Sequence, residues 1–332
     1  MRHCLISYVV LLAALGAPST SNAADIALAQ RTSAAQATAL NARECVSIQP
    51  FYWEIGDAGR ALAGDPVGQD APARDTRMMI ASASKWIYSG YVAERRQGNL
   101  TDEDIRFLTF RSGYTRFRIC RSTQTVSSCM DSLINGFGAQ DSATMNRFDY
   151  NGGHMQKHAA LMGLGAMDND ALGAEIRNGL GRLGPGWDFR YKQPQLAGGG
   201  ISSVADYSRF LRAVMAEDLQ IGKWLGKNAV CTNPQTYPNE AIKTPIPRNE
   251  TWHYSIGHWV EDDPQVGDGA YSSPGAFGFY PWISRDKAYY GIVAREDHQG
   301  VMLANQSEKP GVQSVGCGRL IRAAWMDGQA RH

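Results

Sequence analysis

Hydrophobic residues alternate imperfectly with polar ones near the start of the chain, and this spacing is typical of a β-strand. The alternation runs through residues 45–55, stops at two nearby glycines and resumes at residues 60–63, so we predict a β-hairpin. Residues 24–43 before it are rich in alanine and fit either a helix or a loosely held leader. Residues 64–77 after it are polar and contain Pro and Asp, as surface loops do.

The middle of the chain has mostly helical spacing, and strand-like runs return near its end. We predict helices at residues 130–137, 154–164, 171–180 and 313–326, and strands at 254–260, 276–283 and 288–294. Two further helices have cap signals: Thr101 or Asp102 begins one, and Ser203 begins the other. Strands at both ends with helices between them predict one antiparallel sheet built from both termini, with an all-helical region inserted.

The predicted fold class is therefore α/β, of the α+β kind, with an antiparallel sheet flanked by helices. Residues 24–332 form a single domain in this interpretation. A sheet subdomain takes about residues 45–80 and 250–332, and a helical subdomain takes about residues 81–249. A functional site is expected in the cleft between the two subdomains.

Residues 1–23 have the layout of a secretory signal peptide. Arg2 supplies the positive charge, residues 5–16 form an apolar core, and Ser21-Asn22-Ala23 forms a small-residue cleavage site. The apolar core is too short to span a membrane, so we expect a secreted or periplasmic protein. Cleavage leaves 32 basic and 32 acidic residues, and this balance argues against nucleic acid as a partner.

Five cysteines remain after cleavage, in a chain expected to fold in an oxidising compartment where disulfides form. Cys120 and Cys129 flank a short polar run and are the predicted pair. The pairing of Cys45, Cys231 and Cys317 stays open. No cysteine spacing typical of a zinc site is present.

Candidate chemistry begins with Ser82 and Lys85, which lie three residues apart where an apolar run leads into a predicted helix. One helical turn brings the two side chains to the same face, so the Lys85 amine can reach the Ser82 hydroxyl. A serine hydroxyl needs such a base before it can attack a carbonyl carbon. Backbone N–H groups at the helix start would also stabilise the negative charge that develops during acyl transfer.

The serine-x-x-lysine spacing is a weak signal by itself, because a small residue often caps a core helix. A second copy, Ser284 with Lys287, lies in a charged turn that we interpret as a hairpin. His154 and His158 are spaced like two metal ligands on a helix, but no third ligand accompanies them. We therefore predict no metal site and interpret these histidines as residues of a helix face or a cleft rim.

Two further groups would complete an acyl-transfer site. Tyr150, in the segment RFDYNGGH, is a candidate proton carrier, because a nearby lysine ammonium would lower its pKa toward neutrality. Ala276 lies in a glycine-rich strand bordering the cleft, where its N–H can point toward the same place as that of Ser82. Two such donors make an oxyanion hole. The alternative interpretations are that Tyr150 is a core or rim tyrosine and that the segment around Ala276 is a buried strand whose glycines allow close packing.

These motifs, in this order, resemble those of the serine β-lactamase/transpeptidase-like superfamily, which includes class C β-lactamases, DD-peptidases, family VIII esterases and 6-aminohexanoate-dimer hydrolases. The resemblance covers about residues 45–326 and rests on the segments IASASKW, GNLTDED, LTFRSGY, FDYNGG, GGGISSVADYSRFL, YSIGHW and SPGAFG. It implies the β-lactamase/transpeptidase-like fold, Ser82 as nucleophile, and Lys85 with Tyr150 as the general-base pair. It also implies a covalent acyl-enzyme and no cofactor.

Two departures from the family pattern concern substrate binding. Gly152 stands where the β-lactamases have the asparagine that holds the substrate amide, and Asn151 precedes it. Ser273 stands where a lysine or histidine would bind a substrate carboxylate. The segment at 243–245, Lys-Thr-Pro, imitates that triad without its glycine, and Arg295 is another source of positive charge.

We therefore expect an exported serine hydrolase that cleaves esters or neutral amides through an acyl-enzyme on Ser82. The expected substrate-binding residues are Asn151, Ser273 and Gly275. The alternatives are β-lactamase or DD-peptidase activity on peptidoglycan-like substrates, and a non-catalytic penicillin-binding-like protein. The expected partner is a small-molecule ester or amide, and the sequence leaves its identity and the oligomeric state open.

Overall fold

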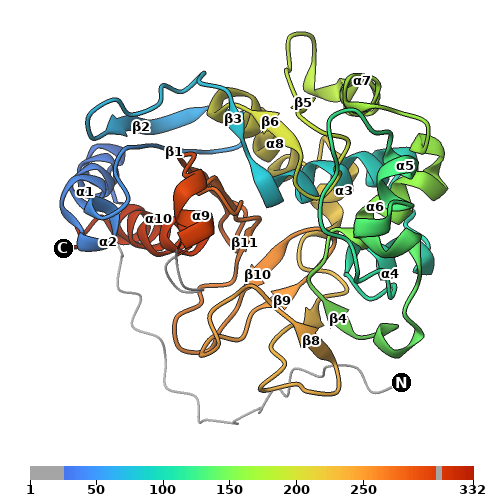
Figure 1. The fold of residues 1–332 in the computed structure, drawn as a ribbon. Helices are drawn as coiled ribbons and strands as arrows, with labels where there is room; N and C mark the ends of the chain where they lie inside the picture. The colour runs from blue at the N-terminus through green and yellow to red at the C-terminus, as the bar shows by residue number, and fades with distance from the viewer. Residues whose placement is uncertain (1–25, 304–308) are drawn as a thin grey trace.

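One large antiparallel sheet organises the chain. The computed structural model describes residues 26–303 and 309–332, so the predicted signal peptide, residues 1–23, lies outside the described residues. In spatial order, the sheet contains β2 (Ala61–Val67), β1 (Phe51–Gly56), β13 (Tyr290–Ala294), β12 (Tyr280–Ile283), β11 (Ala270–Ser272), β10 (Trp259–Glu261), β9 (His253–Tyr254) and β7 (Val230–Cys231). Each neighbouring pair is antiparallel. The predicted sheet built from both ends of the chain is confirmed (Figure 1).

The strands near the C-terminus differ in length from the prediction because tight turns interrupt them. Gly257 has a φ of 70°, and the Ser255 N–H donates to the His258 carbonyl at 2.8 Å, so residues 254–260 form a hairpin rather than one strand. Residues 276–283 become a strand only at Tyr280, after a turn closed by a hydrogen bond from Gly278 to Gly275 (3.0 Å). The hairpin at 254–260 supplies the separate strands β9 and β10.

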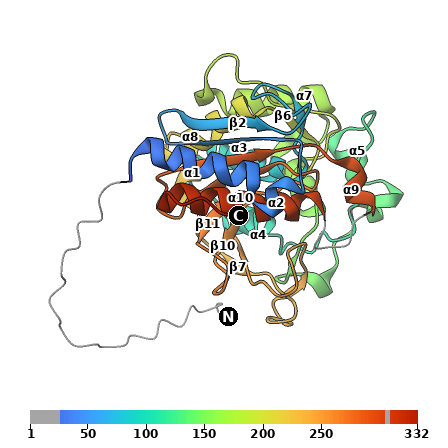
Figure 2. The same ribbon diagram turned by 90° about the vertical axis from the view of Figure 1, so that its left-hand side faces the viewer.

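Helices cover the two faces of this sheet. On one face, α1 (Leu28–Asn41) packs against α10 (Pro310–Asp327), and α10 contacts β12 and β13 (Figure 2). On the other, α8 (Val204–Met215) contacts the same two strands, with α3 (Ser84–Arg95) beside it (Figure 1). None of the helices in residues 26–303 and 309–332 is both long and apolar enough to cross a membrane.

The inserted region forms a second body of structure beside the sheet (Figure 1). Its helices are α4 (Asp102–Leu108), α5 (Val126–Met130), α6 (Gly153–Ala159) and α7 (Asn169–Gly179). Short strands accompany them: β3 (Met78–Met79), β6 (Gly200–Ser202) and β5 (Arg190–Tyr191) form one small sheet, and β4 (Phe148–Asp149) pairs in parallel with β8 (Ala241–Lys243). The strand β7 of the large sheet also comes from this part of the chain, which was predicted to be helical.

The predicted helix caps and the predicted disulfide are present in the structure. Thr101 caps α4 in a capping box with Asp104, and the Ser203 side chain accepts a hydrogen bond from the Asp206 N–H at the start of α8. The predicted disulfide between Cys120 and Cys129 is present. A second disulfide joins Cys45 to Cys317, and therefore ties α2 (Arg43–Val46) to α10.

A buried ionic cluster fixes α10 against the large sheet. Glu261 on β10 is fully buried and lies 2.9 Å from Arg322 Nη2 and 3.1 Å from Arg319 Nε, both on α10. The Tyr280 hydroxyl donates to the same carboxylate at 2.7 Å. Burial alone would raise the pKa of Glu261, but the two guanidinium groups outweigh it and lower the pKa to about 2.

We predict that Glu261→Gln lowers the free energy of unfolding by about 3–5 kcal/mol at neutral pH, because Arg322 and Arg319 lose the buried carboxylate that they share and keep only Asp268 and Glu250 as counter-charges. The carboxylate of the folded wild type has a pKa below its ordinary value of 4.5, so its contribution is present above that pH and is lost as the pH falls toward 2. Urea titrations should therefore show the two proteins converging in acid. The exposed Glu240, changed to Gln, serves as the control. Equal stability of Glu261→Gln and the control at neutral pH would contradict the prediction.

Candidate active site

Ser82 and Lys85 meet at the start of α3, as their spacing predicts. Ser82 lies in a short 3-10 turn, Ala81–Ala83, that runs directly into the helix. The Lys85 Nζ lies 2.7 Å from Ser82 Oγ and also donates to the Ala197 carbonyl at 2.6 Å. The candidate nucleophile and its candidate base are therefore in direct hydrogen-bond contact.

Hydrogen bonds from several segments stabilise the turn that contains Ser82. Ala81 has a φ of 43°, in the left-handed region that a residue with a Cβ rarely adopts. The Ser84 hydroxyl donates to the Ala81 carbonyl (2.6 Å) and accepts a hydrogen bond from the Gly200 N–H (3.0 Å). The Ser273 hydroxyl donates to the Ser82 carbonyl at 3.1 Å. These bonds stabilise a strained backbone at Ala81, directly before the residue expected to attack the substrate.

Burial changes the protonation of Lys85. The side chain is 4% exposed, and loss of water around the ammonium lowers the pKa of Lys85 from 10.5 to about 7. Near neutral pH, much of the amine is therefore unprotonated. An unprotonated amine can still donate to Ala197 while its lone pair accepts the proton of the Ser82 hydroxyl.

Tyr150 also lies at this point, with the Lys85 Nζ 4.8 Å from the centre of its ring. Burial raises the pKa of Tyr150 to about 12, against smaller opposite effects of hydrogen bonds with Ser82 and Trp259. The predicted lowering of this pKa is wrong, because burial of the phenol raises it and burial of Lys85 reduces the positive charge that would have opposed that rise. Tyr150 is therefore a protonated phenol at neutral pH, and Lys85 is the stronger candidate for the base.

The candidate oxyanion donors face one cavity. Ser82 and Ala276 both line it. Ala276 lies in the turn before β12 rather than within a strand, and in the described part of the chain its N–H donates no hydrogen bond. Gly275 lets this turn lie directly against the backbone of Ile80, because a Cβ at position 275 would lie 2.2 Å from the Ile80 carbonyl oxygen.

The other two predicted substrate-binding residues are engaged elsewhere. The Asn151 amide donates to the carbonyls of Thr115 (2.8 Å) and Phe117 (3.2 Å), and its oxygen accepts from the Gly153 N–H at 2.9 Å. Asn151 does not line the cavity next to Ser82. Ser273 is 3% exposed, and its hydroxyl contacts the nucleophile's own backbone, so it supports Ser82 rather than the cavity wall.

The alternative cations lie away from Ser82. Arg295 is buried against α10, where its guanidinium donates to Gln313 (2.7 Å) and to the Pro310 carbonyl (3.3 Å). Lys243 is exposed at the end of β8 and does not line the cavity next to Ser82. Neither residue takes the place of the cation that the family pattern has at position 273.

The two histidines that resemble metal ligands both have protein partners. His154 lies 2.7 Å from the Ser112 hydroxyl and 3.0 Å from the Asp149 carbonyl, and burial lowers its pKa to about 3. His158 lies 2.9 Å from both the Tyr88 hydroxyl and the Asp104 carboxylate. No cluster of three potential metal ligands occurs among the described residues.

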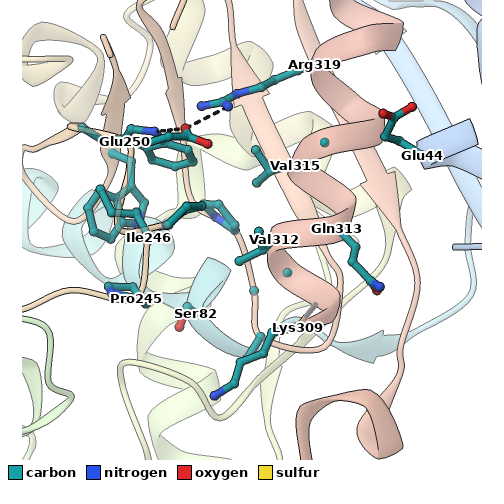
Figure 3. Close-up of a pocket in the computed structure, with 18 of the residues that line it drawn as sticks. Glu44, Ser82, Pro245, Ile246, Glu250, Lys309, Val312, Gln313, Val315 and Arg319 are labelled. Atoms are coloured by element: carbon teal, nitrogen blue, oxygen red, sulfur yellow. Dashed lines mark hydrogen bonds and ion pairs between the residues drawn. The ribbon is translucent and has the colours of Figure 1, made fainter. Parts of the chain in front are cut away.

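The cavity next to Ser82 has a volume of about 470 Å³. It lies between the first turns of α10 and a loop at residues 245–252 (Figure 3). Ser82 lies at one end of it, and a linked Arg319 and Glu250 lie at the other (Figure 3). Its size is ordinary for a small-molecule site.

No family model and no curated protein matches the chain, but solved structures match most of its length. D-amino acid amidase from Ochrobactrum anthropi SV3 has a TM-score of 0.63 at 12% identity, with 88% of this chain and 98% of that one covered. A β-lactamase from Mycobacterium bovis has a TM-score of 0.53 at 11% identity (82% and 95% covered). A penicillin-binding protein homologue from Pyrococcus abyssi, described as octameric, has a TM-score of 0.58 at 13% identity (87% and 76% covered). The chain has the β-lactamase/transpeptidase-like fold.

Within this β-lactamase/transpeptidase-like fold, three groups near Ser82 were missed by the sequence analysis. Ala197 contributes only its carbonyl, so no side chain marks it. Ser84 is buried within the nucleophile motif itself, and the sequence analysis assigned it no role. Trp259, stacked on Tyr150 with ring centres 5.3 Å apart, lies in the segment YSIGHW, for which the sequence analysis predicted a strand and a family resemblance but no role for this side chain.

We predict that kcat/KM for an ester rises with pH through about 7 and then levels off, because only unprotonated Lys85 can accept the Ser82 proton. Initial rates measured from about pH 5 to about pH 9 test this. Lys85→Arg should be inactive throughout, since a guanidinium stays protonated. Lys287→Met, in the second serine-x-x-lysine copy, is the control and should keep the wild-type profile. A rate independent of pH around neutrality would exclude Lys85 as the base.

Proposed function

We propose that this chain is an exported serine hydrolase that cleaves esters or neutral amides through an acyl-enzyme on Ser82. The observation that carries the proposal is the 2.7 Å contact between Ser82 Oγ and a lysine amine whose pKa is about 7, at the end of a cavity. An amine with this pKa is a usable base at neutral pH. Similarity to a D-amino acid amidase supports the choice of acyl transfer.

In the proposed first step, Lys85 takes the Ser82 proton while Oγ bonds to the substrate carbonyl carbon. The N–H groups of Ser82 and Ala276 hold the resulting oxyanion. As the carbonyl re-forms, the bond to the leaving group breaks, and protonated Tyr150 donates to the departing oxygen or nitrogen. Lys85 returns its proton to Tyr150, so both groups are reset for the second step.

Water completes the cycle in the second step. The same lysine removes a proton from water as the water oxygen bonds to the acyl carbon, and the tetrahedral species then releases Ser82. The serine oxygen regains a proton from Lys85, and the acid product leaves. The sequence of steps uses only these side chains, two backbone N–H groups and water.

The preference for uncharged substrates rests on the environment of residue 273. A serine there offers no charge-assisted bond to a substrate carboxylate, a contact worth about 1.5–3 kcal/mol in favourable cases. Its hydroxyl is already used by the Ser82 carbonyl. A carboxylate entering the site would lose hydration without this compensation.

Export is the second part of the proposal. It rests on the signal-peptide pattern at residues 1–23 and on the disulfides Cys45–Cys317 and Cys120–Cys129, which are typical of oxidising compartments.

We predict that Ser82→Ala reduces ester hydrolysis by at least about a thousandfold and abolishes labelling by a fluorophosphonate probe, because the nucleophile is gone. Ser284→Ala is the matched control, since it removes the serine of the second serine-x-x-lysine copy, where the hydroxyl bonds Asp286 in a turn. The substrate class is tested by comparing kcat/KM of the wild-type enzyme for p-nitrophenyl butyrate, an ester, with that for nitrocefin, a β-lactam. Retained activity in a folded Ser82→Ala protein, or faster turnover of nitrocefin than of the ester, would overturn the proposal.

A further inference from the structure

Apolar surface predominates in the lining of the cavity next to Ser82. Hydrophobic and proline side chains contribute much of this lining, among them Pro245, Ile246, Pro247, Trp252, Trp259 and Val312. Figure 3 shows Val312 and Val315 projecting from α10 toward Ile246 across the space. Apolar walls of this kind favour apolar ligand groups, because the gain comes from removing hydrocarbon from water.

The charged groups at the far end of the cavity are committed to one another. Glu250 accepts from Arg319 Nη1 at 3.0 Å and from the Trp252 indole N–H at 2.7 Å. Arg319 also contacts the buried Glu261 and lies over the Trp252 ring, 4.8 Å from its centre. This end therefore offers an ion pair and an aromatic face, with one guanidinium nitrogen, Arg319 Nη2, that has no hydrogen-bond partner among the described residues.

The remaining charged residues of the lining, Glu44 and Lys309, have opposite signs. Glu44 is exposed on α2, and Lys309 precedes the first residue of α10. In Figure 3 the Lys309 side chain points away from Arg319 and Glu250, at the end of the cavity where Ser82 lies. Lys309 is the group that would favour a carboxylate on the ligand, so the effect of its charge must be separated from that of the apolar walls.

We propose that this cavity binds an uncharged hydrocarbon or aryl group attached to the scissile carbonyl of the substrate. The inference rests on the proposed function, since Ser82 defines the reacting end. The group can belong to the acyl side or to the leaving-group side, because both flank the reacting carbon. Each added methylene that enters the cavity should raise kcat/KM by about two- to fourfold.

Two series of substrates distinguish binding of the acyl group in the cavity from binding of the leaving group. One series extends the acyl chain of p-nitrophenyl esters from acetyl to octanoyl, and the other extends the alcohol of alkyl acetates from methyl to octyl. We expect kcat/KM to rise steadily in one series. If Ser82 is labelled by fluorophosphonate and acetyl esters are hydrolysed, but both series are flat, this inference fails while the proposed function stands.

Substitution of Val312 tests whether the rise of kcat/KM with chain length depends on this cavity. This half-buried residue lies in the first turn of α10, where an acidic residue is well tolerated by the helix. Val312→Asp and the bulkier Val312→Phe should each lower the octyl-to-methyl ratio of the responsive series by at least about tenfold. Leu320→Phe, on the same helix but outside the cavity lining, should keep the wild-type ratio. Unchanged ratios in both folded Val312 variants would overturn the inference.

A binding measurement tests the same inference without any turnover. In Ser82→Ala protein, tryptophan fluorescence should report octanamide binding at least about tenfold tighter than acetamide binding, because Trp252 and Trp259 line the cavity. Octanoate should bind no more tightly than octanamide. Tighter binding of octanoate would overturn the uncharged class and assign the cavity to anion recognition by Lys309, and equal binding of both amides would exclude an apolar subsite.

Discussion

The removal of water from the Lys85 amine is the constraint on which the candidate site depends. A buried ammonium is costly, so the group reaches a pKa near 7 instead of remaining fully charged. Its remaining hydrogen-bonding capacity is met by the Ala197 carbonyl and the Ser82 hydroxyl. Ala197 comes from the loop before β6, and Ser82 comes from the 3-10 turn before α3, so these two segments must meet closely to keep water away from Lys85.

Helix α10 connects stability to the shape of the substrate cavity. Its C-terminal half is fixed by Arg319 and Arg322 on the buried Glu261, and its middle is tied to α2 by the Cys45–Cys317 disulfide. Its first turns form a wall of the cavity (Figure 3). The same helix therefore covers one face of the sheet, links the N-terminal and C-terminal segments, and forms a wall of the cavity that Ser82 lines.

Structural similarity at 11–13% identity shows the fold, whereas the chemistry depends on particular side chains. Ser273 illustrates the difference: a position that the family pattern assigns to a cation carries a hydroxyl that holds the nucleophile's carbonyl. Asn151 illustrates it again, because its amide stabilises the surrounding loop. In this chain both positions support local structure, and the cavity along α10 is where we propose that the substrate binds.

The sequence by itself determined what local spacing controls. One helical turn between Ser82 and Lys85, the caps at Thr101 and Ser203, and the short Cys120–Cys129 loop each depend on residues close together in the chain. Only the tertiary structure decided the protonation of Lys85, the raised pKa of Tyr150, the partners of Asn151 and the walls of the cavity. Those properties depend on burial and on contacts between distant segments, which hydrophobic periodicity does not specify.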